Sequence, residues 1–143
     1  MKAAGKRFVL DASVAVAWCF EDEKTPFTEG VLDLLSRTGE GIVPAIWPLA
    51  VANALLAAER RNRISVAKVT ALLARIARLP ISVETIEPNR AFGQVLAVAR
   101  QQLLTSYDAA YVEIALRQGL PLATIDDQLR QAAGQLGIAL VSI

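Results

Sequence analysis

Apolar positions along the chain follow two different periods. A short apolar run such as Phe8–Leu10 is typical of a buried strand, whereas Leu72, Ile76 and Leu79 recur at helical spacing. Ser65 stands where it can cap a helix, and glycines and prolines separate most of the remaining segments. The pattern predicts strands at 7–10, 42–44, 82–86, 120–125 and 138–142, and helices at 13–20, 26–37, 48–62, 65–79, 89–104, 106–118 and 126–136.

Strands alternate with helices along nearly the whole chain. Parallel strands need such crossover helices, so the alternation predicts an α/β fold with a parallel sheet covered on both faces. The 143 residues contain no repeat, low-complexity tract or interdomain linker. We therefore expect a single domain over residues 1–143.

Composition excludes several kinds of chemistry. The chain has no histidine, so it has no Ser-His-Asp triad, Cys-His pair or imidazole acid–base couple. Its one cysteine, Cys19, cannot form an internal disulfide or a cysteine-ligated zinc site. A net charge of +1 argues against a binder that relies on a large basic field. Catalysis would have to use carboxylates, hydroxyls, lysines or an oxygen-ligated metal.

The sequence carries no convincing targeting or membrane signal. Asp11 interrupts the apolar segment that a signal peptide would need, and the apolar stretch 42–58 is short for a bilayer span. A lone thiol suits a reducing compartment. We expect a cytoplasmic protein without membrane association.

Three aspartates occupy similar places in the predicted fold. Asp11 and Asp126 each end a strand and precede a helix, and Asp108 lies in the first turn of another helix. Sites in open parallel sheets form outside the carboxyl ends of the strands. Taken singly, each aspartate also has an ordinary explanation: Asp11 and Asp126 as helix N-caps, and Asp108 as the fourth residue of a capping box.

Together the three carboxylates suggest metal chemistry. Carboxylates that converge at one edge of a sheet repel each other unless a cation lies between them. Mg²⁺ or Mn²⁺ takes oxygen ligands and retains water, so such a site can activate water for attack at phosphorus. This chemistry needs no histidine.

Four segments resemble those of a known family, the PIN-domain ribonucleases, and more closely the VapC-type toxins of bacterial toxin–antitoxin pairs. The resemblance runs from Phe8 to Ile143, and its motifs are Phe8–Ser13, Val43–Leu49 leading into Val51–Leu55, Ser106–Tyr111, and Leu122–Asp126. It implies a three-layer α/β/α sandwich with a central parallel sheet. It also implies a Mg²⁺- or Mn²⁺-dependent endoribonuclease that acts on RNA such as transfer or ribosomal RNA, forms a homodimer and is neutralised by a cognate antitoxin.

The resemblance assigns roles to particular residues. Asp11, Asp108 and Asp126 match the family's acidic positions, which are catalytic and hold the metal. Ser13 and Thr124 match hydroxyl residues that support the aspartates, and Asp127 is a spare carboxylate expected to point to solvent.

One position departs from the family pattern. The family carries a glutamate after the Pro-Leu pair, where this chain has Ala50. Losing this carboxylate should weaken metal binding and could remove a group that orients the attacking water. Ala50 is either an inactivating substitution, the interpretation we favour, or a natural variation.

Residues that bind RNA cannot be identified from the sequence. Arg60, Arg61 and Arg63 could contact phosphates, but a basic, solvated helix end is an equally good explanation. Tyr107 and Tyr111 could stack on bases.

Two other functions compete with a ribonuclease. The chain could be a non-cleaving module that binds antitoxin, RNA or both. A phosphatase-like or response-regulator domain with Asp11 as nucleophile is disfavoured, because Ser13 stands where a haloacid-type phosphatase would have an acid.

Overall fold

The structure is a computed structural model that describes residues 6–143, so the first five residues of the expected 1–143 domain lie outside it. Its four strands are β1 (Arg7–Leu10), β2 (Glu40–Pro44), β3 (Ile81–Glu84) and β4 (Leu122–Ala123). The helices are α1 (Ala12–Ala17), the 3-10 helix η1 (Glu21–Glu23), α2 (Pro26–Arg37), α3 (Trp47–Arg60), α4 (Val66–Ile76), α5 (Pro88–Arg90), the π-helix η2 (Ala91–Val95), α6 (Leu96–Gln102), α7 (Ser106–Gln118) and α8 (Asp127–Leu136).

The strands form one parallel sheet in the order β3-β2-β1-β4. β1 lies in the middle, and Val9 pairs with Ile42 of β2 on one side and with Leu122 of β4 on the other. All carboxyl ends of the strands therefore lie at one edge of the sheet, as the alternating pattern predicted.

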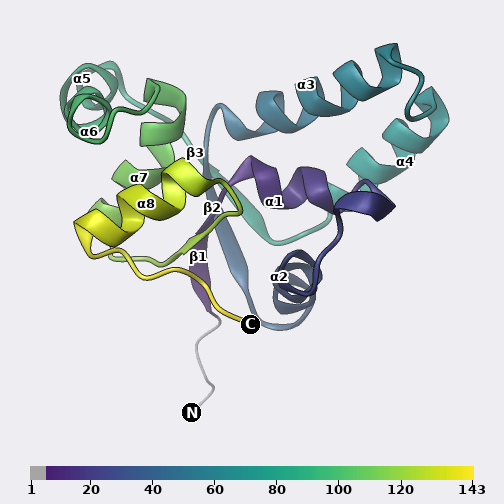
Figure 1. The fold of residues 1–143 in the computed structure, drawn as a ribbon, viewed down its shortest axis with the longest axis horizontal. Helices are drawn as coiled ribbons and strands as arrows, with labels where there is room; N and C mark the ends of the chain where they lie inside the picture. The colour runs from purple at the N-terminus through teal and green to yellow at the C-terminus, as the bar shows by residue number, and fades with distance from the viewer. Residues whose placement is uncertain (1–5) are drawn as a thin grey trace.

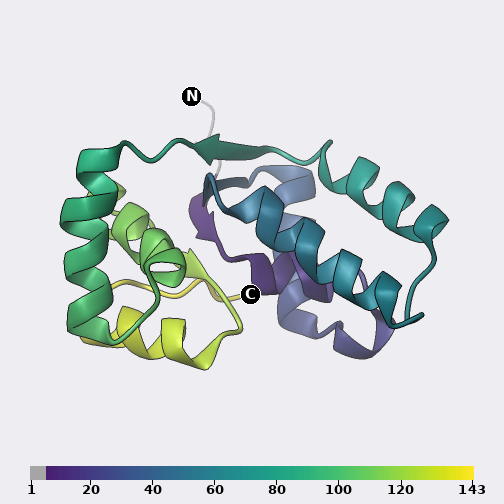
Figure 2. The ribbon, with the colours of Figure 1, turned by 90° about the horizontal axis from the view of Figure 1, so that it is seen from above.

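Helices cover both faces of the sheet. Helices α1 to α4 lie on one side and α5 to α8 on the other, an arrangement that can be followed in two perpendicular views (Figures 1 and 2). Phe8, Val9 and Leu10 are fully buried between the layers, and α7 packs on β1, β2 and β4. The expected three-layer α/β/α sandwich with a central parallel sheet is confirmed.

The C-terminal strands are shorter than predicted. The predicted strand 120–125 reduces to Leu122–Ala123, and the predicted strand 138–142 reduces to a single bridge between Leu122 and Leu140. Leu122 donates to Ala139 and accepts from Val141, so it supplies the bonds that this last segment makes to β4. This pairing therefore extends over a single residue of β4.

The predicted helix 89–104 is interrupted in its middle. Residues Ala91–Val95 form a π-helix between α5 and α6, and Leu103 ends α6 in the left-handed conformation with φ 57°. Insertion of a π-helical turn widens the helix locally and is frequent near functional sites. Within residues 6–143, no helix is both long and apolar enough to cross a bilayer.

A charged network joins β3, α5 and α7. Glu113 of α7 accepts hydrogen bonds from Arg90 at 3.1 Å and from Arg117 at 2.9 Å, and both arginines also pair with Glu84 of β3. The Glu113 side chain is only 5% exposed. The network fixes α7, which carries Asp108, against the edge strand of the sheet.

Candidate active site

Asp11 directly follows β1 and is almost completely buried, with 5% of its surface exposed. Its backbone N–H donates to the carbonyl of Ala123 in β4 at 3.0 Å, which continues the sheet pairing by one residue. Its side chain accepts two hydroxyl hydrogen bonds, from Ser13 at 2.5 Å and from Thr124 at 2.8 Å. Both bonds end on Oδ2, so among the described residues no side chain donates to Oδ1.

The same two hydroxyls hold the loop that follows β4. The backbone N–H of Asp126 donates to Thr124 Oγ1 at 3.0 Å, and the N–H of Ile125 donates to Ser13 Oγ at 3.3 Å. Each hydroxyl therefore accepts from one segment and donates to Asp11. This arrangement fixes the ends of β1 and β4 relative to each other.

Asp126 caps α8. Its Oδ1 accepts from the backbone N–H of Leu129 at 3.1 Å, so the N-cap interpretation of this residue is confirmed. Asp11 precedes α1 but makes no side-chain capping bond. Asp127 is exposed, as expected for the spare carboxylate.

Asp108 is half-buried in the first turn of α7. Its backbone N–H donates to Thr105 Oγ1 at 3.1 Å, which is one half of a capping box. The reciprocal bond, from the Thr105 backbone to the Asp108 carboxylate, does not occur in the described part of the chain. The Asp108 carboxylate is therefore not used in the helix cap.

Electrostatic effects connect the three aspartates. Burial raises the pKa of Asp11, and the charge of Asp126 raises it further, against the lowering effect of the Ser13 and Thr124 hydroxyls. Burial also raises the pKa of Asp108, and the charges of Asp11 and Asp126 add to this effect. Neighbouring negative charge thus disfavours the ionised forms of Asp11 and Asp108, a repulsion that a bound cation would relieve.

The chemistry of these donors fits a hydrated divalent cation. Across residues 6–143, no three acidic, cysteine or histidine side chains converge closely enough to hold a metal ion by direct ligation. Mg²⁺, however, is usually held through one or two carboxylates while it keeps several waters. Asp11, Asp108 and Asp126 supply oxygen ligands of this kind, and the surrounding hydroxyls fix the most buried of them.

Comparison with protein families identifies the chain. Residues 8–135 match the family model described as the PIN domain. The chain belongs to the PIN domain family. A search of curated protein sequences finds no significant match.

Solved structures share this PIN domain fold. The PAE2754 protein of Pyrobaculum aerophilum is 22% identical with a TM-score of 0.67, covering 92% of this chain and 87% of that one. VapBC2 of Rickettsia felis, described as bound to a DNA fragment from their promoter, is 11% identical with a TM-score of 0.65, covering 94% and 97%. FitAcB of Neisseria gonorrhoeae is 19% identical with a TM-score of 0.60, covering 94% and 96%. At these low sequence identities, the comparisons show a shared fold alone.

Ala50 lies in the first turns of α3 in this PIN domain. It is half-buried against the core, and its N–H donates to the carbonyl of Ile46 at 2.9 Å. Helix α3 follows β2, the neighbour of β1 in the sheet, so it begins at the edge where Asp11 lies. A glutamate at position 50 would add a carboxylate to this edge.

Two sequence interpretations change with the structure. Tyr111 is buried, so its ring has no free face for a base, whereas Tyr107 is 65% exposed. Burial raises the pKa of Tyr111, and the charges of Asp11 and Asp108 raise it further. Arg63 pairs with Asp22 and Glu23 at 2.8 Å and lies over the Phe20 ring. The Arg63 guanidinium is therefore already bound to carboxylates and an aromatic ring of the protein itself. Tyr111 follows Asp108 by three residues, about one turn of α7, and this spacing is the sequence signal for the effect of the Asp108 charge on it.

Proposed function

We propose that this PIN domain is a metal-dependent endoribonuclease and the toxin of a toxin–antitoxin pair. PIN domains are typically ribonucleases and typically use a divalent metal. The observation that supports the proposal is the group of three aspartates at the carboxyl edge of the sheet, where burial and neighbouring negative charge raise the pKa of Asp11 and Asp108, in a chain without histidine. We propose that the whole chain is one such domain.

In this proposal Asp11, Asp108 and Asp126 hold Mg²⁺ or Mn²⁺. When bound, the metal supplies an activated water and stabilises the charge that develops on the phosphodiester. Ser13 and Thr124 keep Oδ2 of Asp11 hydrogen-bonded, so they fix the orientation of its carboxylate and leave Oδ1 for a ligand. Asp126 uses Oδ1 to cap α8, which holds its other oxygen in a defined direction.

The family resemblance supports the expected partners, and the single thiol supports the expected location. The fold shared with VapBC2 supports a cognate antitoxin, and a homodimer and RNA such as transfer or ribosomal RNA are the remaining expected partners. The lone thiol of Cys19, which is buried, supports a site of action in the cytoplasm.

Ala50 favours a second candidate function, a PIN module that binds RNA or antitoxin without cutting. With one carboxylate fewer than the family pattern, fewer anionic ligands remain for the metal. We favour an impaired ribonuclease, since the three other acidic positions are all retained.

The test compares the chain as given with Ala50→Glu on transfer and ribosomal RNA, with Mg²⁺, with Mn²⁺ and with a chelator. We expect Ala50→Glu to cut RNA faster, only with metal, and to lose cleavage when Asp11→Asn or Asp108→Asn is added. Asp127→Asn, which removes the neighbouring exposed carboxylate, is the matched control and should leave cleavage unchanged.

Three other results would contradict parts of this proposal. Retained cleavage in both the Asp11→Asn and Asp108→Asn variants would refute the site. Equal activity with and without Ala50→Glu would refute the view that Ala50 impairs the enzyme. RNA binding without cleavage in every form would favour the non-cleaving module.

A further inference from the structure

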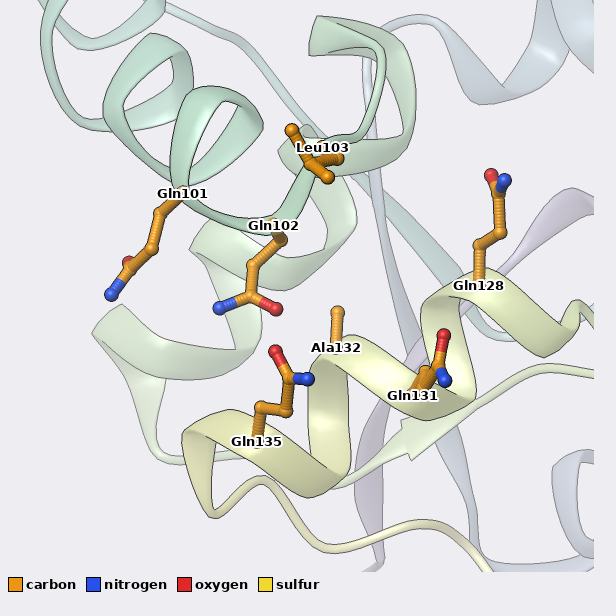
Figure 3. A pocket seen from close by; sticks show the side chains of 7 residues that line it. All are labelled: Gln101, Gln102, Leu103, Gln128, Gln131, Ala132 and Gln135. Carbon is orange, nitrogen blue, oxygen red and sulfur yellow. The ribbon is translucent and has the colours of Figure 1, made fainter.

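A groove lined by glutamines lies between α6 and α8. Its volume is about 420 Å³, within the range of small-molecule and cofactor sites. Five of the seven glutamines in the chain line it, together with one leucine and one alanine (Figure 3): Gln101, Gln102, Leu103, Gln128, Gln131, Ala132 and Gln135. No charged residue lines this groove.

The sequence builds the groove from one face of α8. Gln128, Gln131 and Gln135 are spaced by three and four residues, so they share one side of the helix. Leu129 lies on another side and is buried in the core. In Figure 3, Gln102 of α6 and Gln135 of α8 extend toward one another from the two helices.

The five amide groups are available to a ligand. In the part of the chain that the structure describes, none of these side chains hydrogen-bonds another protein group. Each amide carries two donor hydrogens and one acceptor oxygen, and none is charged. Leu103, which is 87% exposed, adds an apolar surface. A ligand that fits has mixed donors and acceptors beside a flat apolar face, and this describes the edges and faces of nucleobases better than it describes phosphates.

The groove begins beside the acidic site. Gln128 lies two residues after Asp126, in the first turn of α8, and Leu103 lies two residues before Thr105, the cap of the helix that carries Asp108. An RNA strand whose phosphodiester lies at the aspartates would therefore have its next nucleotides near the groove.

We propose that the glutamine groove binds the bases of nucleotides beside the cleaved bond and sets the sequence preference for single-stranded RNA. This inference rests on the proposed ribonuclease function. A docked amphipathic helix fits the groove less well, because such a helix needs a row of apolar contacts and the groove offers only Leu103 and Ala132.

The test removes three amides together, in the variant Gln128→Ala/Gln131→Ala/Gln135→Ala. Alanine keeps the helix and the net charge. Gln94→Ala is the matched control, because Gln94 is an exposed glutamine of η2 outside the groove. The probe is a short, fluorescently labelled, random-sequence single-stranded RNA, whose binding is followed by anisotropy in the presence of a chelator. We expect the triple variant to bind roughly 5- to 100-fold more weakly and the control to bind like the parent.

A second measurement reads sequence preference directly. In the Ala50→Glu background, the bases flanking the cut sites of a random RNA pool are determined by sequencing, and the triple variant should lose the parent's preference. Unchanged binding and unchanged preference, in a parent that binds and cuts RNA, would overturn the groove proposal and leave the ribonuclease intact. Unchanged RNA binding with loss of a copurifying protein would also overturn it, and would assign the groove to that protein. A parent that neither binds nor cuts RNA would remove both proposals.

Discussion

The hydroxyl of Thr124 donates a 2.8 Å hydrogen bond to Oδ2 of Asp11, joining residues that are 113 positions apart in the sequence. Thr124 is fully buried, and its oxygen also accepts from the backbone of Asp126. One hydroxyl thus orients a buried carboxylate and fixes the start of α8.

Thr124→Val should be strongly destabilising. Valine fills a similar volume but leaves the Asp126 N–H and the Asp11 carboxylate without this partner, so we expect the free energy of unfolding to fall by about 1–3 kcal/mol. Urea denaturation measures it. Thr70→Val is the control, because the Thr70 hydroxyl bonds its own helix in an exposed position; a loss no larger than this control's would contradict the role of Thr124.

Asp11→Asn should stabilise the protein at neutral pH. The folded-state pKa of Asp11 is raised above its unfolded value, so its stabilising contribution is present at low pH, where the group is protonated, and is lost as the pH rises through the folded-state pKa. Above that pKa the buried charge costs stability. An asparagine oxygen can still accept from Ser13 and Thr124.

Denaturation across a pH series tests this expectation. Without metal, Asp11→Asn should gain about 0.5–2 kcal/mol near pH 7. The gain should shrink as the pH falls through the carboxyl range. Asp127→Asn, at an exposed position, should show no such gain. A less stable Asp11→Asn variant at neutral pH would show that the carboxylate is stabilising in the folded state.

Glu113→Gln should weaken the attachment of α7. Removing this buried charge leaves Arg90 and Arg117 with Glu84 as their remaining acidic partner, so we expect a loss of about 3 kcal/mol. Asp33→Asn breaks the exposed pair with Arg37 and should cost less than about 1 kcal/mol. Equal losses in the two variants, measured by urea denaturation, would show that the network contributes no more than a surface pair.

Mg²⁺ or Mn²⁺ should raise the thermal midpoint of the protein, because a ligand that binds only the folded state stabilises it, by about 2.7 kcal/mol at a concentration 100 times its Kd. Ala50→Glu should respond at lower metal concentration, and Asp108→Asn should respond weakly. The exposed Asp127→Asn serves as control. Identical metal responses in Asp108→Asn and Asp127→Asn would exclude Asp108 as a ligand.

Local signals predicted the helices better than the strands. The limits of α2 and α7 agree with the prediction because Thr25 and Pro26 begin one helix and Gly119, with φ 65°, ends the other. The predicted strand 120–125 ends at Ala123 in the structure. Thr124 and Asp126, which follow it, bond to Asp11 and cap α8, and neither contact has a signature in local periodicity.

The sequence indicated which residues lie at the carboxyl edge of the sheet, but not how they are connected. Asp11 and Asp126 were expected at the same edge from strand ends, and the family resemblance gave Thr124 a supporting role. The structure joins Thr124 to Asp11 by a hydrogen bond. The pairing of Arg63 with Asp22 and Glu23 depends on contacts across about 40 positions, so the sequence left this arginine equally suited to solvent or RNA.

The place of β4 beside β1 has a consequence during synthesis. Asp11 is translated 113 positions before its partner Thr124, and Asp126 follows Thr124 by two positions. A nascent chain therefore carries Asp11 without the Thr124 hydroxyl and the Asp126 carboxylate until β4 and the start of α8 have been made.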